Sequence, residues 1–183
     1  MKGDEAMKTL TIKARRAYEW ARFKRALVHA TPALAFLILL SFEGATPVRL
    51  VLAVALYVSA VFALMLGQGA EEAVLPSLVY GVVPFAIVRV AESSGHVCMG
   101  EACMSWCLPA CIAGGLAGGA LVGLRGARAK DRLGYHLAST TLVFLVGAMG
   151  CQCAGNAGLL GMASGALMGA AAPIAVRLMW ARR

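Results

Sequence analysis

Long apolar runs alternate with short polar segments along most of this chain. Six runs are each close to the roughly 20 residues that an α-helix needs to cross a bilayer, at about 26–42, 48–67, 73–91, 104–124, 134–152 and 157–179. We therefore predict an all-α, polytopic membrane protein that forms a bundle of six transmembrane helices. The first span is the weakest, because it holds His29 and Pro32 and reaches full length only if the preceding helix continues into it.

The first 25 residues have a different pattern, with many basic side chains and no long apolar run. From about Lys8 no Gly or Pro occurs before Pro32, and apolar residues recur at helical spacing, at Met7, Leu10, Ala14, Ala17 and Ala21. This pattern predicts a short basic amphipathic helix. The chain thus divides into a cytoplasmic amphipathic segment at 1–25 and a transmembrane domain at 26–183.

Composition agrees with a membrane protein. Of the 183 residues 60% are hydrophobic and 14% charged, and the mean hydropathy is +0.76, which is too apolar for a soluble domain. The net charge of +8 could suggest nucleic acid as a partner, but the basic residues flank the apolar runs, so we expect no direct nucleic-acid binding. The first run lacks a cleavage pattern at its end, and we interpret it as an uncleaved span.

The positions of the basic residues orient the protein. With both termini in the cytoplasm, fifteen of the seventeen Lys and Arg residues lie on the inner side, as the positive-inside rule requires. Trp20 and Trp180 then fall at the inner interface and Trp106 at the outer one, where such rings prefer to lie. We expect a multi-pass protein of the bacterial inner membrane, and this orientation places all six cysteines on the outer side.

Soft metal ligands gather between residues 96 and 111 and again at 151–153. Thiolates, thioethers and imidazole bind copper, zinc, cadmium or mercury, and closely spaced thiols also suit a redox sensor. The spacing matches no zinc-ribbon pattern, so a metal or redox site, structural disulfides and cysteines without a special role all remain open. Pro109 places the start of the fourth span near Trp106 or Cys107. The candidate ligands are His96, Cys98, Cys103, Cys107, Cys111, Cys151 and Cys153.

Glycines four residues apart mark the fourth and sixth spans. Two matching segments, at 115–123 and 161–169, each carry a small residue at every fourth position, which lets two helices approach closely. The two spans could therefore pack against each other or form a homodimer. In the same alignment Cys107 corresponds to Cys153, which would place both thiol clusters above one helix pair. The packing residues are Gly115, Gly119, Gly123, Gly161, Gly165 and Gly169.

Several classes of function lack the residues they need. No Asp or Glu lies deep in a predicted span, which argues against a proton-coupled transporter. No nucleophile beside a base and no phosphate-binding loop is visible, so we expect neither an enzyme nor a catalytic residue.

The layout as a whole resembles the NrsF-like family of membrane anti-sigma factors. The resemblance rests on a short basic N-terminus, six spans, cysteine near the start of span four, cysteine at the turn before span six, and a final Arg177-Leu-Met-Trp180. Where the family has a Cys-Pro-Glu setting, this turn is Gly150-Cys151-Gln-Cys153-Ala, and the first cysteine site is expanded to four cysteines.

The resemblance implies a negative regulator that sequesters an extracytoplasmic-function sigma factor and releases it when outer cysteines sense metal or oxidative stress. It implies that Cys107 or Cys111 and Cys151 or Cys153 form the sensing pair, and that residues 1–28 contact the sigma factor. A role for this segment in holding anionic lipid is equally open. The alternative function is soft-metal transport or binding, of the mercury or copper type. The candidate partner-binding residues are Lys13, Arg15, Arg16, Tyr18, Trp20, Arg22, Lys24 and Arg25.

Overall fold

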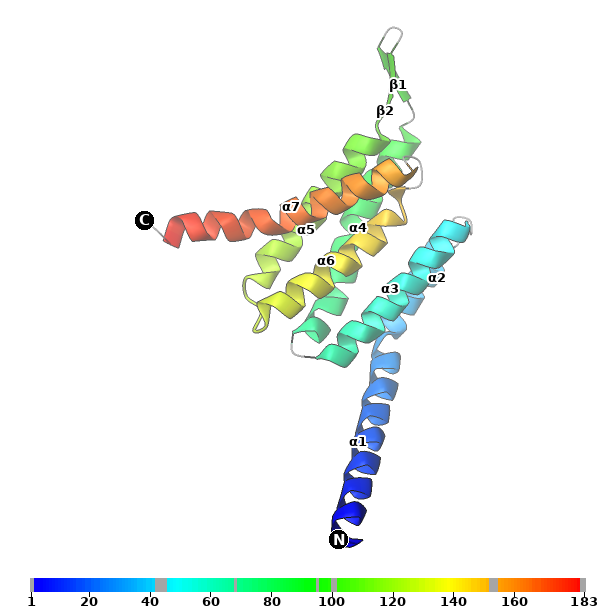
Figure 1. The fold of residues 1–183 in the computed structure, drawn as a ribbon. Helices are drawn as coiled ribbons and strands as arrows, with labels where there is room; N and C mark the ends of the chain where they lie inside the picture. The colour runs from blue at the N-terminus through cyan, green and yellow to red at the C-terminus, as the bar shows by residue number, and fades with distance from the viewer. Residues whose placement is uncertain are drawn as a thin grey trace.

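The computed structural model describes residues 2–41, 46–67, 69–94, 96–99, 102–151 and 155–181. Within these ranges the chain is almost entirely helical, with one short β-hairpin (Figure 1). The predicted all-helical class is confirmed, and the hairpin is an element that the sequence pattern did not predict. The elements in chain order are α1 (Lys2–His29), α2 (Thr31–Ser41), α3 (Pro47–Leu66), α4 (Ala70–Ser93), β1 (His96–Met99), β2 (Ala102–Ser105), α5 (Cys107–Gly126), α6 (Arg132–Ala148) and α7 (Gly155–Ala181).

Local sequence signals set the ends of several helices. The hydroxyl of Thr46 accepts a 3.3 Å hydrogen bond from the backbone N–H of Arg49, and Pro47 occupies the first turn of α3. At the start of α6, the carboxylate of Asp131 accepts a 3.2 Å hydrogen bond from the N–H of Gly134. Gly67 ends α3 with a φ of 64°, a backbone conformation that favours glycine. These caps fix where the connections between the helices begin and end.

The junction of α1 and α2 lies inside the first predicted span. Helix α1 continues past residue 25, where the sequence places the end of the amphipathic segment, as far as His29. Pro32 has no N–H and its ring conflicts with the carbonyl of residue 28, so the helical hydrogen bonding is interrupted there. Thr31 satisfies that carbonyl instead, because its hydroxyl donates a 2.7 Å hydrogen bond to Val28 O.

Three helices, α3, α4 and α5, are long and apolar enough to cross a membrane by length and composition. An integral membrane protein is thus supported, while the predicted count of six spans goes beyond these three helices. Helix α2 has 11 residues and α6 has 17, so both are shorter than the apolar runs at 26–42 and 134–152 from which spans were predicted.

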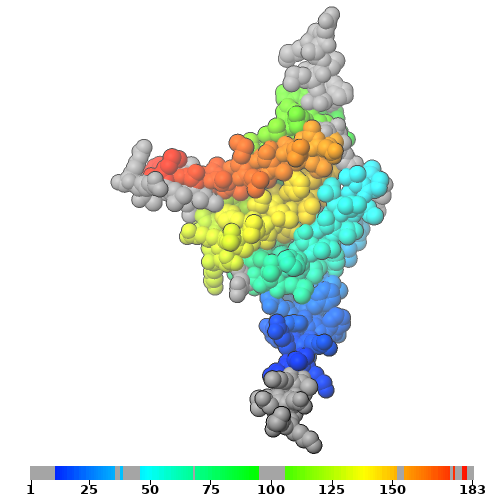
Figure 2. Space-filling view, viewed as in Figure 1, coloured from blue at the N-terminus to red at the C-terminus, as the bar shows by residue number. Residues whose placement is uncertain are grey.

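The helices form a bundle in which α4 packs against α3, α5 and α6, while α7 crosses α5. Figure 1 shows the hairpin extending from one end of this bundle and α1 extending from the opposite end. The space-filling view shows α1 projecting from the body of the molecule, with α7 running across that body (Figure 2). The hairpin end is the predicted outer end, and the α1 end is the predicted inner end.

Side-chain size is distributed in the way that lipid-embedded helices require. The buried positions are mostly Ala, Gly and Val, whereas large apolar side chains on the helix surfaces are well exposed, such as Phe62 (61%), Leu75 (62%) and Leu160 (72%). An apolar surface of this kind would be unstable in water but is favourable against lipid tails. Small buried residues let the backbones pack closely without a hydrophobic driving force between the helices.

Candidate functional site

The start of α5 positions two of the predicted cysteines. Helix α5 begins at Cys107, as Pro109 predicts, and the proline lies in the first turn where its missing N–H has no helical partner to lose. Cys107 and Cys111 are one helical turn apart and therefore lie on the same face of α5. Both are buried, with exposed fractions of 7% and 0%.

Cys111 faces a second buried thiol from another part of the chain. Cys151, which is 1% exposed, lies in the connection between α6 and α7, and its thiol is within hydrogen-bonding reach of Cys111. Both cysteines are free thiols. They pack in one apolar cluster with Val88, Ala110 and Met162. The fold thus brings together one cysteine from each of the two sequence clusters.

The surroundings of Cys151 keep its thiol protonated. The hydrogen bond with Cys111 raises the pKa of Cys151, and burial raises it further. Because the thiolate is the reactive form of cysteine, Cys151 stays a thiol until a reagent or metal ion removes its proton.

Cys107 differs from this pair because it is disulfide-bonded. The end of the bundle that carries the hairpin therefore combines an oxidised cysteine, Cys107, with two reduced ones.

The hairpin places two further cysteines opposite each other. In the antiparallel register of β1 and β2, Cys98 pairs with Cys103 and His96 pairs with Ser105. The side chains of these residues, and the whole of Cys153, lie outside the described residues. Among the side chains that are described, no group of three or more His, Cys, Asp or Glu residues could hold a metal ion. Of the seven predicted metal ligands, only Cys107, Cys111 and Cys151 have side chains that the structure describes.

The glycines of α5 and α7 face each other across the helix crossing. A Cβ atom on Gly119 would clash with the carbonyl oxygen of Ala166, and one on Gly123 would lie 2.7 Å from the carbonyl oxygen of Ala170. From the other side, a Cβ on Gly165 would lie 2.5 Å from Ile112 O. Gly115 and Gly169 also meet backbone of the opposite helix, whereas Gly161 meets side chains of α5. The two ridges bring these helices into backbone contact directly below the thiol pair.

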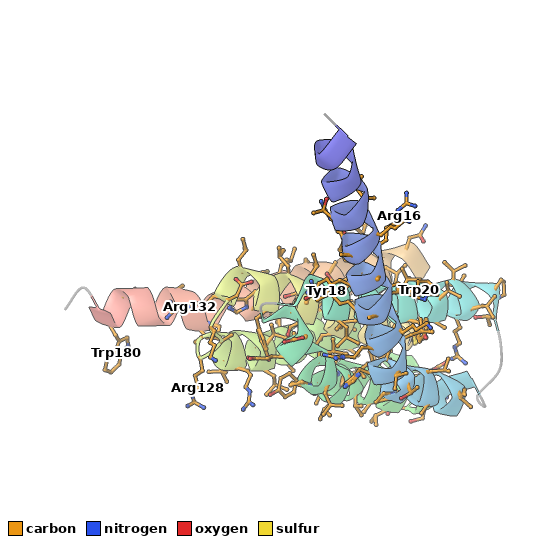
Figure 3. All side chains as sticks on the ribbon, turned by 90° about the horizontal axis from the view of Figure 1, so that it is seen from below. Arg16, Tyr18, Trp20, Arg128, Arg132 and Trp180 are labelled. Carbon is orange, nitrogen blue, oxygen red and sulfur yellow. The ribbon has the colours of Figure 1, made fainter. Side chains whose placement is uncertain are left out.

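At the inner end, the basic residues of α1 fall into two groups. Lys13, Arg15 and Arg16 are exposed, and Arg15 Nε forms a 2.9 Å ion pair with Glu19 Oε1. The Lys24 ammonium lies 5.4 Å from the centre of the Trp20 ring, a cation–π contact typical of an interface. Figure 3 shows Arg16, Tyr18 and Trp20 on the projecting helix.

The second group, Arg22 and Arg25, faces the bundle. With Tyr18 and His29, both arginines line a cavity between α1 and the connection from α3 to α4. All eight residues of the predicted partner-binding set are exposed, and three of them, Tyr18, Arg22 and Arg25, also line this hollow.

One buried polar contact between α4 and α6 was not predicted from the sequence. Ser77 of α4 and Ser139 of α6 are both 0% exposed, and their hydroxyl oxygens lie 2.8 Å apart in a hydrogen bond. Each serine is an isolated hydroxyl within an apolar run, which is the signal that could have identified them, because such groups tend to bond across helices. The contact joins the two helices that lead towards the thiol pair.

No protein-family model, curated protein or solved structure matches this chain. The resemblance to the NrsF-like proteins therefore stays a prediction from the sequence pattern. The residues themselves provide a buried thiol pair at one end of a helical bundle and a basic helix at the other end.

Proposed function

We propose that the protein is a membrane-bound negative regulator. It holds an extracytoplasmic-function sigma factor at the cytoplasmic face and releases it when thiols at the outer face react. In this proposal the chain crosses the bacterial inner membrane six times with both termini in the cytoplasm. The positions of the basic residues support this orientation, because α1 and the loop at 125–132 carry most of them.

The observation that carries the proposal is the pair of free, buried thiols of Cys111 and Cys151. They join the start of α5 to the connection that leads into α7, so a new bond between them changes how two packed helices meet. A pair with a purely structural role would gain nothing from remaining reduced beside the disulfide of Cys107. Two free thiols beside a disulfide-bonded cysteine favour a redox- or metal-sensitive switch over a structural disulfide.

Two reactions suit a thiol pair in this setting. Hydrogen peroxide can oxidise Cys111 to a sulfenic acid with release of water, and the Cys151 thiol then attacks the sulfenic sulfur and releases a second water to form a disulfide. The pair loses two protons and two electrons in this sequence, and the peroxide is reduced to two waters. Alternatively, a soft metal such as cadmium binds both sulfurs and displaces their two protons.

The helix packing offers a route from the thiols to the inner face. Helices α5 and α7 contact each other through their backbones, with no bulky side chains between them. In this proposal a change in how their outer ends meet therefore moves both helices as rigid bodies. Such a shift alters partner binding only if the inner face has two arrangements with different affinities. A coupling of about 1–3 kcal/mol, typical of allostery, changes affinity roughly 5- to 150-fold.

The partner surface is proposed to be the exposed part of α1 together with the basic loop after α5. Figure 3 shows Arg128 and Arg132 at a distance from α1 on the face seen from below, which makes the basic surface broad. A broad basic surface suits an acidic protein partner. The sigma factor as that partner follows from the family resemblance.

Expression of a sigma-dependent reporter tests the proposal in cells. The double variant Cys111→Ser, Cys151→Ser should keep the reporter silent under cadmium, copper or singlet oxygen, because serine can neither be oxidised to a disulfide nor bind soft metals. Deletion of residues 1–25 should make the reporter constitutive. The matched control, Cys98→Ser with Cys103→Ser, should respond as the wild type does. A full response from the Cys111→Ser, Cys151→Ser protein would disprove a sensing role for this pair.

Soft-metal transport or binding is the alternative, and two buried thiols are also suitable ligands for it. It is weakened because no cysteine lies in the inner half of the chain's predicted spans, so ligands do not continue through the membrane. Metal uptake by cells that express the protein distinguishes the two. A regulator should leave cellular cadmium and copper unchanged, whereas a carrier should raise them.

A further inference from the structure

The cavity at the inner end of the bundle has the features of an anion-binding site. Its volume is about 480 Å³, and it lies between α1 and the connection from α3 to α4. Gly67 ends α3 and Glu71 lies in the first turn of α4, and both residues line the cavity. The cavity therefore lies where two membrane-crossing helices end, which is the depth of the lipid head groups.

The charged groups of the cavity leave it positive. Arg22 and Arg25 face one acidic residue, Glu71, so the formal charge is +1. Among the side chains that the structure describes, neither arginine makes an ion pair. The guanidinium of Arg22 reaches across to the end of α3, where its Nη2 lies 2.6 Å from the position of a Cβ on Gly67. Two guanidinium groups near one hollow match the geometry of a phosphate.

His29 is held at the deep end of this cavity. Its Nδ1–H donates a 2.8 Å hydrogen bond to the carbonyl oxygen of Arg25, which fixes the ring on the last turn of α1. The ring also lines a second hollow of about 430 Å³. The two hollows share His29, Leu64 and Glu71, so they adjoin each other.

The second hollow is apolar and runs deeper into the membrane. Beyond the shared residues it is lined on α4 by Val74, Leu75 and Leu78. From Glu71 to Leu78 the helix rises about 10 Å, which takes the groove from head-group depth into the hydrocarbon region. A basic cavity with an apolar groove below it matches an amphiphile with an anionic head.

We propose that the two hollows together bind one anionic phospholipid, with its phosphate beside Arg22 and Arg25 and one acyl chain in the groove along α4. A free phosphate would use the arginines but leave the groove without an occupant. An acidic segment of a protein partner would have to place apolar side chains below the head groups, which a soluble partner does not do. The lipid would hold α1 against the ends of α3 and α4.

Native mass spectrometry of the full chain in a neutral detergent tests this. Phosphatidylglycerol and phosphatidylethanolamine with the same acyl chains are compared as probes. The wild type should bind phosphatidylglycerol about tenfold more tightly, because basic residues near a membrane surface favour anionic lipid. The double variant Arg22→Gln, Arg25→Gln should lose that preference. The matched control, Arg15→Gln with Arg16→Gln on the exposed part of the same helix, should keep it.

Two further measurements keep the proposal open to refutation if the glutamine variant folds poorly. Arg22→Lys with Arg25→Lys retains both charges and should retain most of the preference for phosphatidylglycerol. Glycerophosphoglycerol, the head group without acyl chains, and inorganic phosphate should compete weakly for the site. Equal binding of both lipids, an unchanged glutamine variant, or an equal loss in the Arg15, Arg16 control would refute the site. Efficient displacement by inorganic phosphate would show a free-anion site and overturn the assignment to lipid.

Discussion

The two ends of the bundle are built in opposite ways. At the outer end Cys111 and Cys151 are fully enclosed by apolar side chains and backbone, and glycine ridges lock α5 to α7 just below them. At the predicted inner end α1 extends away from the bundle (Figure 1), and its basic and aromatic side chains between Lys13 and Trp20 are exposed. A group that must register a small chemical change benefits from rigid surroundings, whereas a surface that must capture and release a partner has to be open. The contrast favours a sensor at one end and a binding surface at the other.

The assignment of sensor and binding surface depends on which end of the bundle faces the cytoplasm. Cysteine labelling tests this orientation, and the opposite orientation would exchange the two assignments. Glu5→Cys and Arg183→Cys, each introduced into a protein without its native cysteines, should stay unlabelled by a membrane-impermeant thiol reagent in intact cells. We expect this result because fifteen of the seventeen basic residues lie on the assigned inner side. Labelling of either residue would put the thiol pair on the cytoplasmic side.

A bulky side chain in the glycine ridge should disrupt the contact between α5 and α7, through which we propose that the two ends are coupled. Gly119→Leu places a side chain against the backbone of Ala166 and should lower stability by about 3 kcal/mol, the upper end for overpacking. Thermal unfolding in detergent measures this. Ala171→Leu, at an exposed position of α7, is the matched control and should change stability little. If both variants melt at the same temperature, the ridge does not hold α5 and α7 together.

A smaller loss of stability is expected when the contact between α4 and α6, which lies between the two ends of the bundle, is changed. Ser77→Ala removes one partner of a buried hydrogen bond and should destabilise the protein by about 0.6 kcal/mol, the average for such bonds in membranes, and by at most about 1.7 kcal/mol. A cycle with Ser139→Ala and the double variant isolates the contact. Strictly additive effects of the two single changes would show that the hydroxyls do not interact.

The smallest loss of bundle stability should come from substitutions in the hairpin. Cys98 and Cys103 lie directly opposite each other, and opposed residues in antiparallel strands have the Cα separation that a disulfide needs. We predict a disulfide between them, detected by mass spectrometry of unreduced peptides. Replacing both with serine should leave thermal unfolding of the bundle almost unchanged, because the hairpin projects from it. Recovery of Cys98 bonded to Cys107 would contradict this pairing.

The sequence predicts the helices well where local chemistry decides their ends. The start of α5 follows from Pro109, and the facing glycines follow from their spacing in two spans. The hairpin was missed because strands of only four residues, His96–Met99 and Ala102–Ser105, are too short to show a clear alternation of polar and apolar side chains. The pairing of Cys111 with Cys151 depends on how α5, α6 and α7 meet, so spacing along the chain could indicate the two clusters but not which thiols touch.

The central claim is that the outer thiol pair controls binding at the inner helix. Its most direct test is release of the proposed sigma-factor partner from sealed membrane vesicles, before and after peroxide or cadmium is added on the side that carries the thiol pair. The wild type should lose the partner, with affinity falling about 5- to 150-fold. The Cys111→Ser, Cys151→Ser protein should retain it under both treatments. Equal release from both proteins would show that the partner, if it leaves at all, does so without a signal from this thiol pair.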